Sequence, residues 1–533
     1  FSVAILAQGP SGIGRQGDNA SPWRPNSNVD GPPALDRPCR EGRIRPASVS
    51  SRVMAGPSTD GGEPTEKTRL IHKDDEEEKD QTWGDYFYSI VIAGTGFFAD
   101  AYDLFVIDLV MSILMRLNPE QIGPWEKSII GSSTLIGAVF GQVSFGLLGD
   151  WFGRKWTFVA TCVLIIVGTV ASGLCQWTDP EHPFKLVYQL ALCRLVLGVG
   201  VGGEYPLAAT IAAESSTKKN RGSLVAAVFS MQGWGMLTSC IVVLALLAAE
   251  VELDVVWRAA LIVGAIPSAL VIILRYKLEE SNMFIEAAGN EADEAKLTLS
   301  QKLSTTWEHI KLYWHPLVGT TMTWLILDIT FYGTGSFKSR ISGFLVETHA
   351  ETPEEQIWHE SIFATICVCM AIPGYLLSVK YLDRIGRYNL QLGGFIAMAV
   401  NFALLASLRP HLPGHMSWLL VVFFGLTFLF SNFGPNTTTF VIPSEVYPTV
   451  IRATCHGLSA AAGKIGAVIG VVAFSPCEEA FGLTAVLGSC SVVCLVGAVF
   501  TYFFTSDQVV DLKKLDQLRK LQMQDPVPES KMA

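Results

Sequence analysis

The stretch Gly146–Lys155, GLLGDWFGRK, joins two long apolar segments, and a related stretch, Ser378–Tyr388 (SVKYLDRIGRY), does the same later in the chain. Each stretch contains an aspartate followed three and four places later by glycine and arginine, and Asp383 lies 233 positions after Asp150. A glutamate that precedes an arginine by seven places also occurs twice, at an offset of 231. Two independent motifs with nearly the same offset predict that the chain is a duplicated unit. The charged residues of the repeat are Asp150, Arg154, Glu214 and Arg221 in the first copy and Asp383, Arg387, Glu445 and Arg452 in the second.

Long apolar segments account for most of the remaining sequence. Of the 533 residues, 50% are hydrophobic and 17% are charged, whereas about a quarter of the residues in a soluble domain are charged. About twelve runs reach the roughly 20 apolar residues with which a helix spans hydrocarbon, and helices satisfy their own backbone hydrogen bonds in lipid. We therefore predict an all-α membrane protein with about twelve transmembrane helices in two pseudo-symmetric six-helix halves. The expected spans are 86–114, 126–148, 156–176, 186–213, 224–249, 257–275, 313–336, 358–380, 389–408, 416–442, 452–473 and 482–505.

Basic residues are concentrated in the loops that follow even-numbered spans, for example Arg154, Lys218 and Arg384. Because short loops rich in Lys and Arg stay in the cytoplasm, we expect both termini to be cytoplasmic, with the plasma membrane as the location. Residues 1–84 are rich in Pro, Gly, Ser and Arg without an apolar period, which predicts a disordered tail. The expected parts are this tail, six-helix bundles at 85–275 and 313–506, a cytoplasmic central loop at 276–312, and a C-terminal tail at 507–533 that contains an amphipathic helix.

Five ionisable residues lie inside apolar segments: Asp100, Asp103, Glu204, Asp328 and Lys464. A charge near the bilayer centre costs at least a few kcal/mol, so such residues usually face a polar interior and have a function there. Four carboxylates with one lysine indicate a path for protons and a binding site for an anion.

Several function classes find no support in the sequence. The 11 cysteines are scattered, mostly in apolar runs, without the spacing of metal ligands, so we expect neither a metal site nor another cofactor. No nucleophile–base set, nucleotide loop or nucleic-acid signature stands out, which argues against an enzyme and against a nucleic-acid partner.

The loop Asp150–Lys155 resembles the signature loop between spans 2 and 3 of major facilitator transporters, although Trp151 replaces its usual basic residue. In that superfamily, substrate binds at the midplane between two six-span halves. The stretch Gly198–Ser216, GVGVGGEYPLAATIAAESS, closely resembles the signature of phosphate:proton symporters, a family that usually has Asp where this chain has Glu204. The motifs that also resemble this family are FFADAYDLF (Phe97–Phe105), FSMQGWG (Phe229–Gly235), WLILDITFYG (Trp324–Gly333), FGPN (Phe433–Asn436) and GKIGA (Gly463–Ala467).

The resemblance covers roughly residues 84 to 510 and implies roles for individual positions. It assigns proton movement to Asp100 or Asp103 and to Glu204, to which we add Asp328. The charged residues of the repeat are expected to form gating or structural pairs at the cytoplasmic face. The positions that the resemblance assigns to the phosphate site are Tyr205, Gln232, Trp324, Asp328, Tyr332, Asn436 and Lys464.

These residues also suit phosphate by their chemistry. Lys464 supplies a positive charge with three donors, and tyrosine, tryptophan and amide side chains supply neutral donors. Asp328 can accept a hydrogen bond from a phosphate hydroxyl, which a fully ionised anion such as sulfate lacks. Trp324, Asp328 and Tyr332 follow one another at four-residue steps and share one helix face. Gln232 and Lys464 are 232 positions apart, so the repeat predicts that they face each other across a central cavity.

A coupling hypothesis follows from electrostatics. Two unit charges about 4 Å apart interact by roughly 4 kcal/mol at an effective dielectric near 20, so an anion beside ionised Asp328 is disfavoured. Without substrate, we expect Lys464 to pair with Asp328. Burial disfavours the charged form of a carboxyl group. Proton binding at Asp100, Asp103 and Glu204 would therefore permit anion loading, and release to a more alkaline cytoplasm would reverse it.

The leading interpretation is a monomeric secondary transporter in the lipid bilayer that takes up inorganic phosphate with protons by alternating access. A permease for an organic phosphate, such as a glycerophosphodiester, is the nearest alternative, because GGEYP (Gly202–Pro206) also resembles that branch. A non-transporting phosphate sensor with the same fold is an alternative from another class. Sodium in place of protons stays open, while a sugar porter is disfavoured because buried Lys464 suits an anion.

Overall fold

The chain is described by a computed structural model, which covers residues 84, 87–88, 90–178, 185–289, 298–335, 352–411, 418–506 and 511–524. Within these ranges the backbone forms helices joined by connections, with no strand, as the composition predicts. The tail predicted for residues 1–84 lies outside the described residues except for Gly84. All described residues belong to one compact unit.

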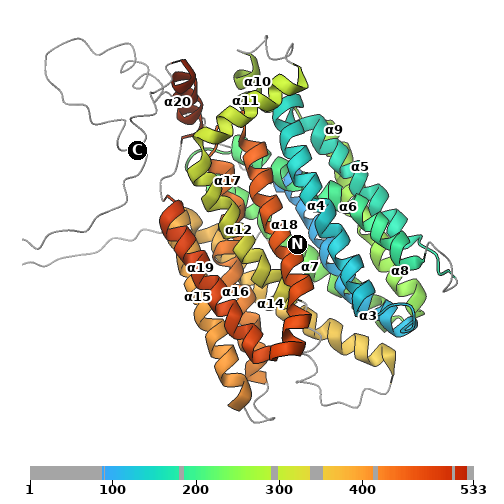
Figure 1. Ribbon diagram of the computed structural model, residues 1–533. Coiled ribbons are helices and arrows are strands. Elements are labelled where there is room, and N and C mark those ends of the chain that lie inside the picture. The colour runs from blue at the N-terminus through green and yellow to red at the C-terminus, as the bar shows by residue number, and fades with distance from the viewer. Residues whose placement is uncertain are drawn as a thin grey trace, which may run out of the picture. The chain divides into compact units, whose positions relative to one another are not determined.

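The first half contains the six predicted spans (Figure 1). The first span begins with a short π-helix, and the sixth is divided at Gly264. The sequence gives no clear signal for either interruption. The elements are η2 (Ile90–Gly94), α3 (Thr95–Leu117), α4 (Pro124–Phe152), α5 (Arg154–Gly173), α6 (Leu186–Glu214), α7 (Arg221–Ala248), α8 (Leu253–Val263) and α9 (Ala265–Tyr276).

The second half repeats this arrangement, with its tenth span divided at Gly434. One span begins at Pro353 rather than 358, because Thr352 caps its N-terminus by accepting from the N–H of Glu355 at 3.2 Å. This polar first turn lies outside the apolar run from which the span was predicted. The elements are α12 (Trp314–Gly335), α14 (Pro353–Ile385), α15 (Arg387–Leu408), η4 (Arg409–His411), α16 (Trp418–Asn432), α17 (Pro435–Glu445), α18 (Arg452–Phe481) and α19 (Leu483–Phe504).

Ten of the described helical segments are long and apolar enough to cross a membrane by length and composition. The first span is not among them because α3 contains three aspartates, Asp100, Asp103 and Asp108. The other predicted span outside this set is α12, which contains Asp328. The two spans that fall outside the set therefore carry three of the four acidic residues singled out in the sequence.

In the described part of the chain, three helices lie outside the spans: α10 (Asn282–Gly289), α11 (Leu299–Leu312) and α20 (Leu512–Gln524). They gather at one end of the bundle, at the top of Figure 1. We call this the basic end, because the loops rich in Lys and Arg lie there. α20 is the amphipathic helix that the sequence predicts in the C-terminal tail.

The two halves meet along α4 and α18, which lie side by side in Figure 1. A Cβ atom added at Gly146 would lie 2.7 Å from the carbonyl oxygen of Ala453, and one at Gly457 would collide with the carbonyl oxygen of Gln142. Small residues allow helix backbones in membranes to approach this closely. α7 and α14 form the matching contact, so the duplication is visible in the packing.

Candidate functional site

A small cavity lies between the two halves. It measures about 10 Å³, roughly the space that one water molecule needs. All seven residues that the sequence predicts for an anion site line it. Phe229 also lines it and was not predicted, although it lies three places before Gln232 and shares its helix face. The lining residues are Tyr205, Phe229 and Gln232 from the first half and Trp324, Asp328, Tyr332, Asn436 and Lys464 from the second.

The ammonium group of Lys464 provides a positive charge at this cavity, and its side chain is buried. Its Nζ donates to Asp328 Oδ2 at 3.0 Å and to the hydroxyl of Tyr332 at 3.1 Å. The same atom lies 5.1 Å from the ring centre of Tyr205, which is within the range of cation–π attraction. The pair with Asp328 that we expected without substrate is therefore present.

Amide groups enter the cavity from both halves. Asn436 lies near the start of α17, and its Nδ2 donates to Asn432 Oδ1 at 2.7 Å and to the hydroxyl of Tyr375 at 3.4 Å. Gln232 comes from α7, and its Oε1 is buried without a hydrogen-bond partner among the described residues. Because a buried, unpaired amide oxygen is costly, Gln232 has a capacity for hydrogen bonding that a ligand with a hydroxyl group could use.

Three phenylalanine rings pack against one another beside the cavity, and one of them, Phe229, lines it. Phe440 lies one turn beyond Asn436 along α17, and its ring centre is 4.9 Å from that of Phe97 and 4.8 Å from that of Phe229. Phe97 and Phe229 belong to the first half, and Phe440 belongs to the second. This aromatic layer therefore joins the halves beside the cavity.

The buried acids of the first half form a second polar region near this layer. Asp103 Oδ2 accepts from the hydroxyl of Thr169 at 2.8 Å, and its backbone carbonyl accepts from Arg194. Glu204 is paired with Arg275, while both carboxyl oxygens of Asp100 are buried without a hydrogen-bond partner among the described residues. The two arginines were not predicted. The rule that singled out the acids would have found Arg194, which lies inside the apolar run Leu186–Glu214.

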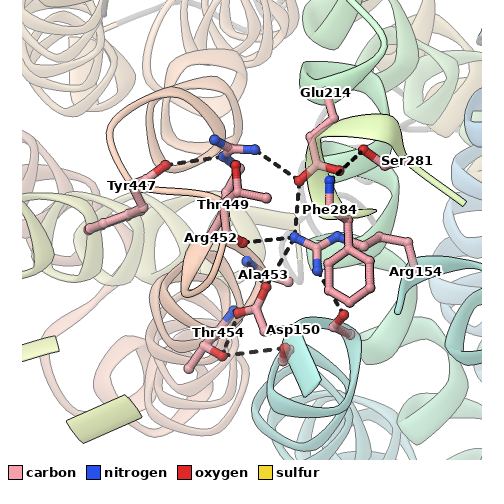
Figure 2. Close-up of polar contacts among 12 residues, drawn as sticks. Asp150, Arg154, Glu214, Ser281, Phe284, Tyr447, Thr449, Arg452, Ala453 and Thr454 are labelled. Atoms are coloured by element: carbon pink, nitrogen blue, oxygen red, sulfur yellow. Dashed lines mark hydrogen bonds and ion pairs between the residues drawn. The ribbon is translucent and has the colours of Figure 1, made fainter. Parts of the chain in front are cut away.

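The first copy of the repeat forms a buried network at the basic end, shown in Figure 2. An Arg154 nitrogen lies 3.2 Å from Asp150 and 3.0 Å from Glu214, and Arg452 donates to the same oxygen of Glu214 at 2.9 Å. Asp150 accepts from the N–H of Thr454, near the start of α18, at 2.7 Å. Since Arg452 and Thr454 belong to the second half, this network connects the two halves.

The second copy forms the matching network. Arg387 lies 2.8 Å from Asp383 and 2.8 Å from Glu445. Asp383 accepts from the N–H and the hydroxyl of Ser223, near the start of α7, at 2.9 and 2.6 Å. Arg221, the remaining predicted residue, is buried at the first position of α7. The second network therefore also connects the two halves.

The glycine of each repeated loop has a backbone conformation that side chains rarely adopt. The φ angle is 95° at Gly153 and 90° at Gly386, a region that favours glycine. Each glycine ends one span and begins the next, which brings the aspartate and the arginine of the motif together.

A smaller contact connects the halves at the opposite end. Arg116, in the last turn of α3, lies 2.7 Å from Glu360 on α14, and its Nε donates to Gln356 at 3.2 Å. The sequence-based predictions did not include this pair, because charges at the ends of apolar runs are common. The cavity thus lies between polar contacts at both ends of the bundle.

Comparisons with known proteins agree with this arrangement. Residues 88–511 match a family model described as "Sugar (and other) transporter". The "Putative inorganic phosphate transporter 1-13" of Oryza sativa subsp. japonica is 36% identical over 478 residues, with 83% of this chain and 93% of that protein covered. The "Inorganic phosphate transporter 1-1" of Arabidopsis thaliana is 35% identical, with 73% and 84% covered.

The solved structures that resemble the chain include the proton:xylose symporter XylE bound to 6-bromo-6-deoxy-D-glucose. That comparison has a TM-score of 0.66 at 19% sequence identity and covers 82% of this chain and 99% of the other. At this identity, the similarity shows the major facilitator fold.

Proposed function

Since the chain belongs to the inorganic phosphate transporter family of the major facilitator superfamily, we propose that it imports inorganic phosphate together with protons by alternating access. The observation that carries this proposal is the cavity around Lys464, where one cation meets neutral donors from both halves. Phosphate offers both negative oxygens and a hydroxyl, and this cavity has partners for each.

We assign phosphate binding to the seven predicted residues. Lys464 exchanges part of its interaction with Asp328 for phosphate oxygens, and Asp328 then accepts from a phosphate hydroxyl. Tyr205, Tyr332 and Trp324 donate from the cavity wall. A cavity of about 10 Å³ is too small for phosphate, so loading requires that the halves move apart on one side.

Proton coupling is assigned to the group of buried carboxyl groups in the first half, for which the sequence predicts Asp100, Asp103 and Glu204, together with Asp328. A proton bound by any of these carboxyl groups reduces the negative charge that opposes an incoming anion. A membrane potential that is negative inside adds about 2.3 kcal/mol per net positive charge per 100 mV. Transport of more than one proton per phosphate would therefore use both the pH gradient and the potential.

The charged networks are proposed to act as gates between two six-helix bundles, 85–275 and 313–506. Lys and Arg in short loops place the basic end in the cytoplasm, which makes both termini and the central segment 276–312 cytoplasmic. Opening toward the cytoplasm would then break the contacts of Figure 2, and opening outward would break the Arg116–Glu360 pair. The proposed location is the plasma membrane, with the monomer as the transport unit.

The test is uptake of labelled phosphate into proteoliposomes under an imposed inward proton gradient, with a glycerophosphodiester as competitor. We expect accumulation that a protonophore abolishes and that the competitor leaves unchanged. Competition at low concentration would indicate an organic phosphate permease. Binding without accumulation would indicate a sensor. Uptake that depends on a sodium gradient would indicate coupling to sodium instead of protons.

A further inference from the structure

The buried charges in the core of the first half, apart from those at the basic end, do not balance. Its core holds three carboxyl groups, Asp100, Asp103 and Glu204, and among the described residues two guanidinium groups, Arg194 and Arg275, are buried with them. A buried charge without a partner is costly, so one of the three carboxyl groups is expected to hold a proton while the others stay ionised.

Glu204 is the carboxyl group with the most partners. Arg275 Nη1 donates to its Oε2 at 2.8 Å, Arg275 Nη2 contacts its Oε1, and the hydroxyl of Thr161 donates to Oε2 at 3.2 Å. Two-point contact between guanidinium and carboxylate is a strong form of hydrogen bonding. Protonation of Glu204 would weaken its contact with Arg275, because the group would lose its negative charge and one oxygen would become a donor.

Arg275 is itself held in place. Its guanidinium lies over the ring of Phe158 at 3.7 Å and within 3.4 to 3.5 Å of the carbonyl oxygens of Ile92 and Phe158. A side chain at Gly96 would collide with both Arg275 and Glu204, so the pair packs directly against the backbone of α3. This arrangement leaves the ion pair little room to separate.

The length of the glutamate contributes to this contact. Phosphate:proton symporters usually have aspartate at this position, and an aspartate carboxylate would lie about 1.5 Å, or one carbon–carbon bond, farther from Arg275. The two-point contact with Arg275 therefore depends on Glu204. A shorter acid would leave Arg275 free to interact with other carboxyl groups.

Asp100 has the opposite environment. It lies one turn beyond Gly96 on α3, and neither of its buried oxygens has a hydrogen-bond partner among the described residues. The charged groups that act on it are Glu204, Arg275 and Asp103, while Tyr205 from α6 and Cys162 from α5 are the other ionisable groups that interact with it.

Building on the proposed function, we propose that Arg275 is a positioning residue that holds Glu204 in a permanent ion pair, so that the transported proton is carried by Asp100 and not by Glu204. Glu204 then acts as a fixed negative charge. This narrows the proposed function, in which both acids belong to the proton-coupling group, by leaving Glu204 out of proton transfer.

The experiment replaces the pair with neutral amides in the full-length chain. Glu204→Gln alone and Arg275→Gln alone each leave a buried charge without its partner, and we expect each to lower proton-driven phosphate uptake by about tenfold or more. The double variant removes both charges, so we expect uptake within about threefold of the unmodified protein, with the same pH profile.

Loss of proton-driven accumulation in the double variant, with phosphate exchange between the two sides retained, would overturn the proposal, because it would show that Glu204 carries the proton. Asp100→Asn serves as the comparison and should show that phenotype. If the double variant fails to fold, Glu204→Asp tests the same point. The shorter side chain frees the carboxylate at position 204 from Arg275, so the pH dependence of phosphate uptake should change. An unchanged pH dependence would contradict the inference. Absence of proton-driven accumulation in the unmodified protein would refute the proposed function instead.

Discussion

The two halves share one fold but hold different charges in their cores. Among the described residues away from the basic end, the core of the first half has three carboxyl groups with two arginines, and that of the second has the pair Lys464–Asp328. Glu204 and Tyr205 are neighbours on α6, yet Glu204 faces Arg275 in the first half and Tyr205 lines the cavity near Lys464. In the proposed function, the carboxyl groups of the first half handle protons and the cation of the second half binds the anion, and α6 carries a residue of each region.

The two copies of the charged repeat also differ, in how far their aspartates are exposed to water. The side chain of Asp150 is 1% exposed and that of Asp383 is 21% exposed. In the first copy, Arg154 interacts with both acids and with the backbone of the second half. The first copy therefore depends more on its arginine than the second copy does, because water can solvate Asp383.

The largest effect should come from the cation of the second half. In Lys464→Ala, Asp328 loses its partner, and an uncompensated buried charge costs roughly 3–5 kcal/mol, so we expect phosphate uptake to fall by about 100-fold or more. Gln232→Ala at the equivalent place in the first half removes neutral hydrogen bonds worth about 1 kcal/mol each, so its loss should be about tenfold or less. Uptake at limiting phosphate measures both, and equal losses would contradict the division between the halves.

A second comparison uses the two copies of the repeat. Arg154→Gln should destabilise the conformation in which the basic end is closed by roughly 3–5 kcal/mol. Arg387→Gln should destabilise that conformation less. Cys455 is a buried thiol on α18, next to the Asp150 contact, so its rate of alkylation reports opening.

We expect faster labelling of Cys455 in Arg154→Gln than in Arg387→Gln, measured by mass spectrometry. Cys490, which is buried within α19, is the internal control for general unfolding. Similar labelling of Cys455 in both variants would show that the two copies stabilise the closed basic end equally.

The charged residues of the cavity could be predicted from the sequence alone, whereas Tyr205 and Asn436 were assigned by the resemblance to phosphate:proton symporters. Lys464 and Asp328 are charges in apolar runs, and Trp324 and Tyr332 share a face with Asp328 through simple helix spacing. The duplication then placed Gln232 opposite Lys464. Phe229 was missed because a phenylalanine in an apolar helix carries no such signal.

The arrangement of the buried acids in the first half could not be predicted, because it depends on contacts between distant helices. Arg275 lies at the end of its predicted span, where a basic residue is ordinary, and its partner Glu204 is 71 positions away in the chain. The break at Gly264 also lacks a clear one-dimensional signal, since glycine is common in membrane helices. The break at Gly434 was missed although Pro435 follows it directly, and a Gly-Pro pair is a sequence signal for a helix break.

The smallest effect should come from the C-terminal helix. Asp516 on α20 accepts from the N–H and the hydroxyl of Thr449 at 2.8 and 2.6 Å, and the carbonyl of Thr449 accepts from Arg154 at 2.9 Å. Asp516→Asn weakens a charge-assisted contact, so the closed basic end should lose about 1 kcal/mol and Cys455 labelling should rise by a few-fold. Lys218→Ala is the matched control, because its exposed pair with Asp511 spans 3.9 Å and such pairs contribute little. A rise for Lys218→Ala as large as that for Asp516→Asn would show that α20 influences the first copy of the repeat through surface charge in general and not through Thr449.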